Sequence, residues 1–183
     1  AMDEMKKAGK IRHYGVSVEK VEEALKAIEY PGISTVQIIF NMMRLKPAEQ
    51  FFPKAVEKNV GVIVRVPLAS GLLTGKFTPD TQFEAEDHRK FNRFGDHFDK
   101  GETFSGVNYE LGIKLTHDHY RRLFGEKYLV QHALRWVLMF DAVSCVIPGA
   151  SSPEQVKGNV LASETPAITP LAMREIKRVY DEH

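Results

Sequence analysis

Residues 147–159 (IPGASSPEQVKGN) carry the pattern with the clearest chemical meaning in this sequence. An apolar strand would end there at Pro148 and Gly149, and a helix would begin with Ser152 as its N-cap and Pro153 at its first position. The first turn of a helix leaves backbone N–H groups without a helical partner, and such groups attract anions. The segment therefore predicts a phosphate site, with an ordinary strand-to-helix turn as the alternative.

Residues 67–77 (PLASGLLTGKF) form a second segment suited to anions. Gly71 and Gly75 permit backbone angles that other residues avoid. Ser70 adds a hydroxyl donor and Lys76 a cation on the same stretch. These groups would suit a diphosphate. Because the spacing is not that of a P-loop, a flexible loop with a solvated lysine is the alternative.

Three polar side chains occupy positions near the expected ends of strands. Arg65 lies among valines, where a long cation is costly unless it faces a cleft, pairs with a carboxylate or stacks on a flat ligand. Ser17 and Gln37 place further polar groups near the carboxyl ends of two other expected strands. An internal salt bridge for Arg65, and packing or capping roles for Ser17 and Gln37, are the alternatives.

Other reactive side chains do not form a recognisable constellation. His117 and His119 lie on a polar, helical stretch without a carboxylate cluster, so we expect no metal site. Tyr14 has no catalytic partner nearby in the sequence. Cys145 is the one cysteine and sits within an apolar run. We therefore expect a small buried hydrophobe there, no disulfide, and a reducing cytoplasmic setting.

The elements that must position these residues alternate between strand and helix. Short apolar runs predict four strands, and apolar residues at three-and-four spacing predict the helix that follows each. The third helix comes only after a long interval, which is typical of a functional loop. The strands are expected at residues 11–17, 36–41, 61–67 and 143–148, and the helices at residues 18–28, 47–58, 129–140 and 152–161, with a final helix from Thr169 onward. The helix over residues 47–58 is expected to be interrupted or started by Pro53.

Four strand-helix units predict an α/β fold with a parallel sheet covered on both faces. An open doubly wound sheet and a (β/α) barrel both fit this pattern. A complete barrel needs at least about 200 residues, so the 183 residues of this chain could form only part of one. A half-barrel leaves two strand edges open, which favours pairing with another chain.

Composition narrows the classes of partner. The chain is 43% hydrophobic and 27% charged, which indicates one soluble globular domain over residues 1–183. A formal net charge of +1 provides no field to gather nucleic acid or membrane lipids. No apolar stretch approaches the roughly 20 residues of a membrane span, and the first residues lack the apolar run of a signal peptide.

Taken together, the segments resemble the aldo-keto reductase family, in its bacterial general-stress branch. They occur in the family's order and spacing over nearly the whole chain. The resemblance implies the C-terminal half of a (β/α)8 TIM barrel, with strands five to eight followed by a C-terminal helix, and residues 69–125 as a long loop covering the cofactor. The matching stretches are GKIRHYGVS, STVQIIFN, GVIVRVPLASGLLTGKF, DHRKFNRFGDHFDKGETFSGV and ALRWVLMFDAVSCVIPGASSPEQVKGNV.

The family binds NADP(H) in an extended pose and reduces carbonyl compounds by hydride transfer. By resemblance, Ser17 and Gln37 hold the nicotinamide carboxamide, and Arg65 replaces a residue, often tyrosine, that lies against the ring. The diphosphate contacts carry over to Pro67, Leu68, Ser70, Gly71, Leu72, Gly75 and Lys76. The adenosine contacts carry over to Pro148, Gly149, Ala150, Ser151, Gln155 and Asn159.

Two departures from the family pattern affect the cofactor and the chemistry. Gln155 stands where many members have an arginine for the 2′-phosphate, so we expect NADP(H) while NAD(H) stays open. Arg93, or alternatively Arg89, could supply the missing charge from the loop. The family's catalytic tetrad of Asp, Tyr, Lys and His lies on the first four units. No position here matches it, so the chain alone is expected to be inactive or very weak.

Three hypotheses follow. The first is that the chain is the cofactor-binding half of an NADP(H)-dependent reductase, with a small carbonyl substrate only if the other half is supplied. The second is a stand-alone half-barrel that binds nucleotide or self-associates, as a homodimer that closes the barrel. The third is a remnant without function. None of them involves a nucleic acid, a membrane or a metal.

Overall fold

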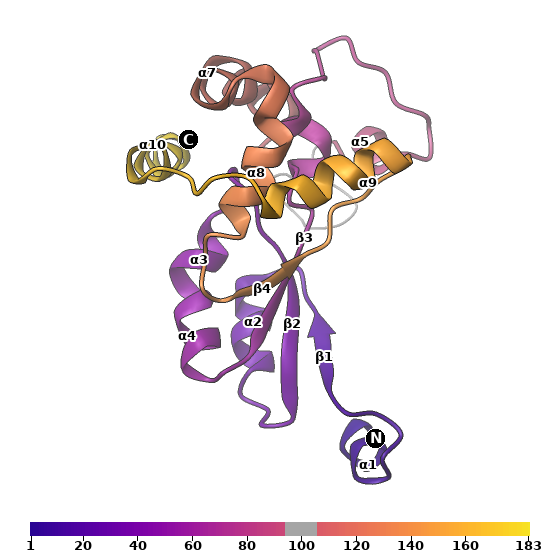
Figure 1. The fold of residues 1–183 in the computed structure, drawn as a ribbon. Coiled ribbons are helices and arrows are strands. Elements are labelled where there is room, and N and C mark those ends of the chain that lie inside the picture. The colour runs from indigo at the N-terminus through magenta and orange to yellow at the C-terminus, as the bar shows by residue number, and fades with distance from the viewer. Residues whose placement is uncertain (94–105) are drawn as a thin grey trace.

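The computed structural model describes residues 1–93 and 106–183, and within them the chain folds around a four-stranded parallel sheet (Figure 1). The strands are β1 (Tyr14–Ser17), β2 (Ile33–Ile39), β3 (Gly61–Arg65) and β4 (Val143–Val146). Each strand pairs in parallel with the next one along the chain. A doubly wound sheet reverses its strand order at a switch point, whereas a barrel keeps consecutive neighbours together. The strand order therefore favours the half-barrel over the doubly wound sheet.

Helices follow the strands as the periodicity predicts. The helix expected over residues 47–58 is interrupted, as Pro53 predicts: it is divided at Phe51 into two short helices, and a proline occupies the first turn of each. The helices are α1 (Met2–Lys7), α2 (Val21–Ala27), α3 (Lys46–Gln50), α4 (Phe52–Glu57), α8 (Leu129–Val137), α9 (Pro153–Val160) and α10 (Pro170–Asp181). No described helix is long and apolar enough to cross a membrane.

The connection between β3 and α8 contains short helical segments that periodicity did not reveal. A 3-10 helix, η1, follows β3 directly, and a π-helix, η2, joins α6 to α7. The segments are η1 (Ala69–Thr74), α5 (His88–Phe91), α6 (Tyr109–Leu115), η2 (Thr116–Tyr120), α7 (Arg121–Phe124) and η3 (Glu126–Tyr128). The rest of the connection, residues 94–105, lies outside the described residues, so the expected covering loop over residues 69–125 is described only in part.

The hydrophobic core lies on one face of the sheet. Val36, Val62 and Val64 alternate along β2 and β3 and are fully buried. Above them, the rings of Phe40 and Trp136 stack with centroids 4.9 Å apart, which ties the end of β2 to α8. The helices therefore cover this face and fix the positions of the carboxyl ends of the strands.

The opposite face of the sheet is less completely covered. Gln37 and Ile63 lie in register there and are half-buried, and Ile63 is paired with Cys145 of β4. Cys145 is exposed, so the expectation of a buried cysteine is wrong. Its apolar neighbours suggested burial on both sides, but β4 is an edge strand and Cys145 lies on the face away from the helices.

Candidate functional site

Two polar side chains meet at the carboxyl ends of β1 and β2. Ser17 and Gln37 are register partners, and the Ser17 hydroxyl donates to Gln37 Oε1 at 3.3 Å. Because this bond uses the amide oxygen, the Gln37 NH2 group is the part of the side chain that can donate to a ligand. The structure thus brings together the two residues predicted to hold a carboxamide.

Arg65, the third predicted residue, reaches across the same rim from β3. Its Nη2 donates to the carbonyl oxygen of Val18, just beyond β1, at 3.1 Å. Since β2 lies between β1 and β3, the side chain passes in front of the end of β2. This bond holds the guanidinium at the carboxyl ends of the strands.

Two polar residues of the segment after β2 reinforce the rim, and the sequence analysis missed both. The Asn41 amide donates to the Val66 carbonyl at 3.2 Å, and Arg44 Nη2 donates to the Glu19 carbonyl at 3.0 Å. Both side chains are buried. The signal available in the sequence was their position directly after an apolar strand, since a buried polar group needs a hydrogen-bond partner.

The segment after β3 has an unusual backbone. Val66, Ala69 and Ser70 have φ values of 52, 50 and 55°, and Gly71 has 96°. A positive φ is costly for any side chain and most of all for a β-branched one, and such strain gathers at functional sites. The Thr74 hydroxyl closes the turn by donating to the Gly71 carbonyl at 2.6 Å. The predicted diphosphate segment is therefore a strained turn with a fixed shape.

Side chains of this turn differ in where they lie. Leu72 is buried and Leu68 packs against the core, so any ligand contact from these two predicted residues would come from their backbone. Pro67 is buried as well, whereas Lys76 is exposed. A Cβ added at Gly75 would lie 3.4 Å from the Leu129 side chain. Ser70 and Lys76 are thus the side chains of this group with reactive atoms near the surface.

Helix α5 packs onto the turn. His88 Nε2 lies 3.4 Å from the Ser70 hydroxyl, and a Cβ at Gly71 would lie 3.8 Å from Arg89 Nη1. Asp87 caps the helix through the Arg89 N–H at 2.8 Å and binds the Arg89 guanidinium through both carboxylate oxygens. The sequence offers Arg89 only as an alternative cation and gives no signal for His88. Nothing in the residue spacing reveals that α5 folds back onto Ser70.

The charge states of this helix follow from those contacts. The Arg89 guanidinium lowers the pKa of Asp87 from 3.8 to about 2, so the carboxylate is ionised at neutral pH. Burial lowers the pKa of His88, which keeps the imidazole neutral at pH 7. The Arg89 guanidinium also lies 4.5 Å from the centroid of the Phe83 ring. Arg89 is therefore fixed in place, while His88 is the group whose charge can change.

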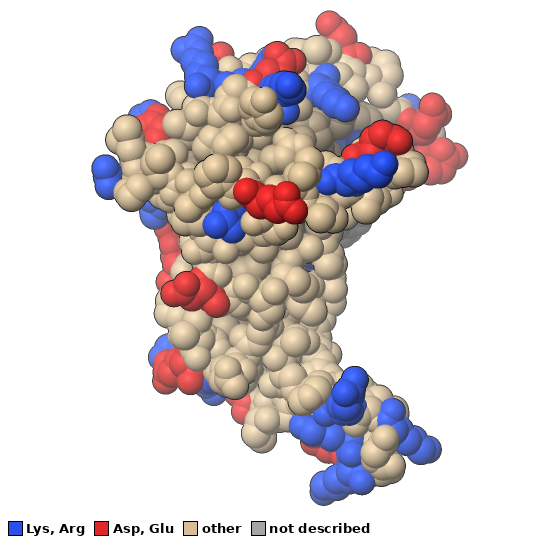
Figure 2. Space-filling view, in the orientation of Figure 1, with Lys and Arg blue, Asp and Glu red and all other residues tan. Residues whose placement is uncertain are grey.

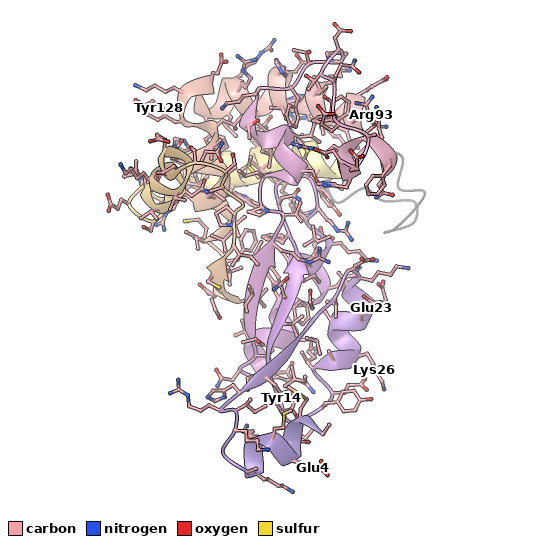
Figure 3. The ribbon with its side chains drawn as sticks, turned by 90° about the vertical axis from the view of Figure 1, so that its right-hand side faces the viewer. Glu4, Tyr14, Glu23, Lys26, Arg93 and Tyr128 are labelled. Carbon is pink, nitrogen blue, oxygen red and sulfur yellow. The ribbon has the colours of Figure 1, made fainter. Side chains whose placement is uncertain are left out.

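Arg93 lies further along the same aromatic cluster, at the end of the molecule far from Tyr14 (Figure 3). Its guanidinium carbon is 4.3 Å from the centroid of the Tyr109 ring. The Tyr109 hydroxyl donates to the Thr78 carbonyl at 3.1 Å, just beyond the turn. Among the described residues, no hydrogen bond or ion pair joins Arg93 to residues 147–159, the predicted site of the 2′-phosphate, so its role as a substitute cation remains a prediction.

The first turn of α9 has the predicted cap. The Ser152 hydroxyl accepts from the Gln155 N–H at 3.3 Å, which confirms the N-cap. The Gln155 side chain accepts from the Ser151 N–H at 2.7 Å. In a regular capping box it would accept from the N–H of the N-cap residue, Ser152. Asn159 donates to the Gly149 carbonyl at 3.4 Å.

The segment that leads into α9 is open to solvent. A Cβ at Gly149 would meet no atom within 4 Å, and Ala150 and Ser151 are exposed, as is Gln155, while Pro148 is half-buried. Gln155 and Asn159 would have to exchange an internal hydrogen bond for a contact with a nucleotide. The predicted adenosine residues therefore form an accessible but self-bonded loop.

Two side chains that the sequence analysis set aside are occupied elsewhere. The Tyr14 hydroxyl donates to Asp3 at 2.5 Å, at the amino end of β1 and beside α1 (Figure 3). His117 contacts the Phe77 carbonyl at 3.2 Å and Arg121 at 2.7 Å. Within residues 1–93 and 106–183, no three His, Cys, Asp or Glu side chains form a group that could hold a metal ion.

Comparisons with known proteins point to one family. The model of the aldo/keto reductase family matches residues 1–181. The aldo-keto reductase YhdN of Bacillus subtilis is 30% identical over 85% of this chain. L-glyceraldehyde 3-phosphate reductase of Escherichia coli K12 is 28% identical over 85% of this chain. Each match covers 45% of the relative's own length. Glycerol dehydrogenase of Gluconobacter oxydans is similar in structure, with a TM-score of 0.75 and 26% identity over all of this chain and 53% of its own.

A further solved structure, the apo aldo-keto reductase of Bacillus halodurans, has a TM-score of 0.71 and 26% identity, covering 97% of this chain and 54% of its own. The chain thus spans about half the length of the relatives that it matches. The family match extends over nearly the whole sequence, through the turn after β3 and the α9 segment alike. The chain belongs to the aldo/keto reductase family.

Proposed function

We propose that this chain supplies the cofactor-holding half of an NADP(H)-dependent aldo-keto reductase, with the catalytic tetrad on the half that these residues do not include. The observation that carries the proposal is the rim formed by Ser17, Gln37 and Arg65. Their side chains converge at the carboxyl ends of three adjacent parallel strands, which is where barrels of this class place their ligands.

The chemistry of the rim fits a nicotinamide. The Gln37 NH2 group can donate to the carboxamide oxygen, and the Ser17 hydroxyl oxygen can accept from the carboxamide nitrogen. The Arg65 guanidinium is planar and is held by the Val18 carbonyl, so it offers a flat surface on which a ring can stack. These residues would orient the ring.

The turn after β3 fits a diphosphate. Its strained backbone is fixed, Ser70 carries a hydroxyl at its surface, and Lys76 brings an exposed ammonium group for which the described residues provide no ion pair. A fixed turn with a nearby cation binds an oxyanion without having to order the chain first. The α9 loop, with Gln155 and Asn159, would hold the adenosine end.

A bound nicotinamide supplies the hydride for carbonyl reduction, whereas the proton must come from an acid that we place on the missing half. The names of two relatives, an L-glyceraldehyde 3-phosphate reductase and a glycerol dehydrogenase, describe interconversion of carbonyl and alcohol groups and support this reaction class. The first turn of α9 contains Glu154 and no arginine or lysine, so preference for NADP(H) over NAD(H) depends on cations outside that turn.

A second candidate function, a stand-alone half-barrel that self-associates, is favoured by exposed apolar side chains on the helix before β1 and on the helix after β4, the two outer strands of the sheet. On α1, Met2 is 43% exposed, and on α9, Val156 and Val160 are 52% and 61% exposed. Figure 2 shows few charged side chains on the middle and right of the narrower part between the helices at the top and α1, while charged side chains lie along its left margin. A homodimer that closed the barrel would bury these groups.

Two measurements separate these functions. If the chain is one half of a reductase, the reading frame upstream of Ala1 should encode further strand-helix units with Asp, Tyr, Lys and His. If the chain acts alone, light scattering after size exclusion should give the mass of a dimer. An upstream stop codon would contradict the first function, and a monomer across micromolar concentrations would contradict the second.

A further inference from the structure

Helix α5 presents a titratable side chain to the turn after β3. His88 Nε2 lies 3.4 Å from the Ser70 hydroxyl, although 18 residues separate them. Ser70 has a φ of 55° in the strained part of the turn, and its hydroxyl lies beside the imidazole. The two groups could donate to the same oxygen of an anion, because an imidazolium donates from Nε2 and a serine from its hydroxyl.

We propose that His88 is a ligand of the cofactor's diphosphate and that its protonation makes nucleotide binding depend on pH. This inference rests on the proposed function, which places the diphosphate at this turn. It adds a residue that donates a charge-assisted hydrogen bond only in its protonated form.

The surroundings of His88 allow the imidazole to respond to a bound anion. On its own segment it faces Asp87, with 3.7 Å between Nδ1 and Oδ1, and Arg89. Asp87 is already bound to Arg89 through both carboxylate oxygens, so these two neighbouring charges largely compensate each other. The residue of η1 that faces His88 is Ser70, which carries no charge. Lys76, two residues after η1, is the charged residue next to that helix.

The sign of the pH dependence follows from linkage. Burial favours the neutral imidazole in the free protein, and a diphosphate beside it would favour the imidazolium. Binding would then take up a proton, so the affinity rises as the pH falls through the neutral range. The His88 side chain is 42% exposed, which gives solvent protons access to it.

The matched control is His13, which also contacts a serine hydroxyl. His13 Nδ1 lies 3.3 Å from Ser34 Oγ, at the amino ends of β1 and β2 and away from the turn. Wild-type chain, His88→Gln and His13→Gln would be titrated with NADPH at about pH 6 and pH 8, with nucleotide fluorescence as the readout. The 2′-phosphate of NADPH itself titrates near pH 6, so variants are compared with wild type at each pH.

We expect His88→Gln to weaken NADPH binding about tenfold at pH 6 and less than about threefold at pH 8, the size of one charge-assisted hydrogen bond. His13→Gln should bind like wild type at both values. Calorimetry of wild type with NADH, which lacks the 2′-phosphate, should show proton uptake near pH 7 in two buffers of different ionisation enthalpy. This measurement does not depend on the folding of a variant.

Three results would overturn the role of His88 while leaving the proposed function intact. They are NADPH binding by His88→Gln equal to that of wild type, an equal loss of affinity at both pH values, and no proton uptake when wild type binds. Failure of wild type to bind NADPH at either pH would instead overturn the proposed function, and the role of His88 with it.

Discussion

Replacing Arg65 with alanine should weaken the binding of NADPH but not that of its adenosine half. The guanidinium crosses from β3 to the Val18 carbonyl, 3.1 Å from Nη2, and offers its planar face to the rim. Stacking of a cationic plane on an aromatic ring contributes about 0.5 to 2 kcal/mol, which corresponds to an affinity lower by about 2-fold to 30-fold. Arg65→Lys should show much of the same loss, because an ammonium keeps the charge but not the plane.

The assay compares Kd values for NADPH and for 2′,5′-ADP, which has the adenosine end without the nicotinamide, in wild type and both variants. The substitution also removes a hydrogen bond to a charged donor, so we expect it to lower the free energy of unfolding by about 1 to 2 kcal/mol. Urea titrations would establish that the variants are folded under the binding conditions. An unchanged Kd for NADPH, or an equal loss for both ligands, would refute the stacking role of Arg65.

Three further predictions test the surroundings of the rim. Arg89 lowers the pKa of Asp87 from 3.8 to about 2, so the ionised carboxylate should stabilise the fold by about 2 kcal/mol above about pH 4. Urea titrations should show that wild type is more stable than Asp87→Asn at neutral pH and that this difference disappears as the pH falls toward 2. Gly71→Ala should lower the melting temperature by several degrees and weaken NADPH binding, because Gly71 has a φ of 96° and an added Cβ would lie 2.8 Å from the Phe77 ring. Cys145 should react with a thiol reagent in the monomer at the rate of a small exposed thiol and be protected in a closed dimer. Slow reaction of the monomer would contradict the exposure of Cys145.

The sequence predicts the architecture because runs of β-branched residues and helical spacing both respond to burial. The strands at β3 and β4 begin where residues 61–67 and 143–148 predict them. β1 is shorter than residues 11–17, since Arg12 and His13 are exposed and lie before the paired region. These differences lie at the ends of elements, where pairing with a neighbour decides the boundary and local pattern does not.

The site is less predictable, because its contacts join residues far apart in the chain. Parallel pairing follows from the strand pattern and brings Ser17 to Gln37. The bond from Arg65 to Val18 spans 47 residues, and no spacing encodes it. The positive φ of Val66 is imposed by the surrounding structure against the preference of a β-branched residue. Cys145 was wrongly expected to be buried because an apolar run does not reveal which strand lies at the edge.

The most direct test of the central claim is a titration of the 183-residue chain with NADPH, followed by addition of a small aldehyde. We expect saturable binding that Arg65→Ala weakens, with no consumption of NADPH after the aldehyde is added. Absence of saturable binding would contradict the assignment of a cofactor-holding half. Steady oxidation of NADPH by the purified chain would contradict the placement of the catalytic residues on the missing half.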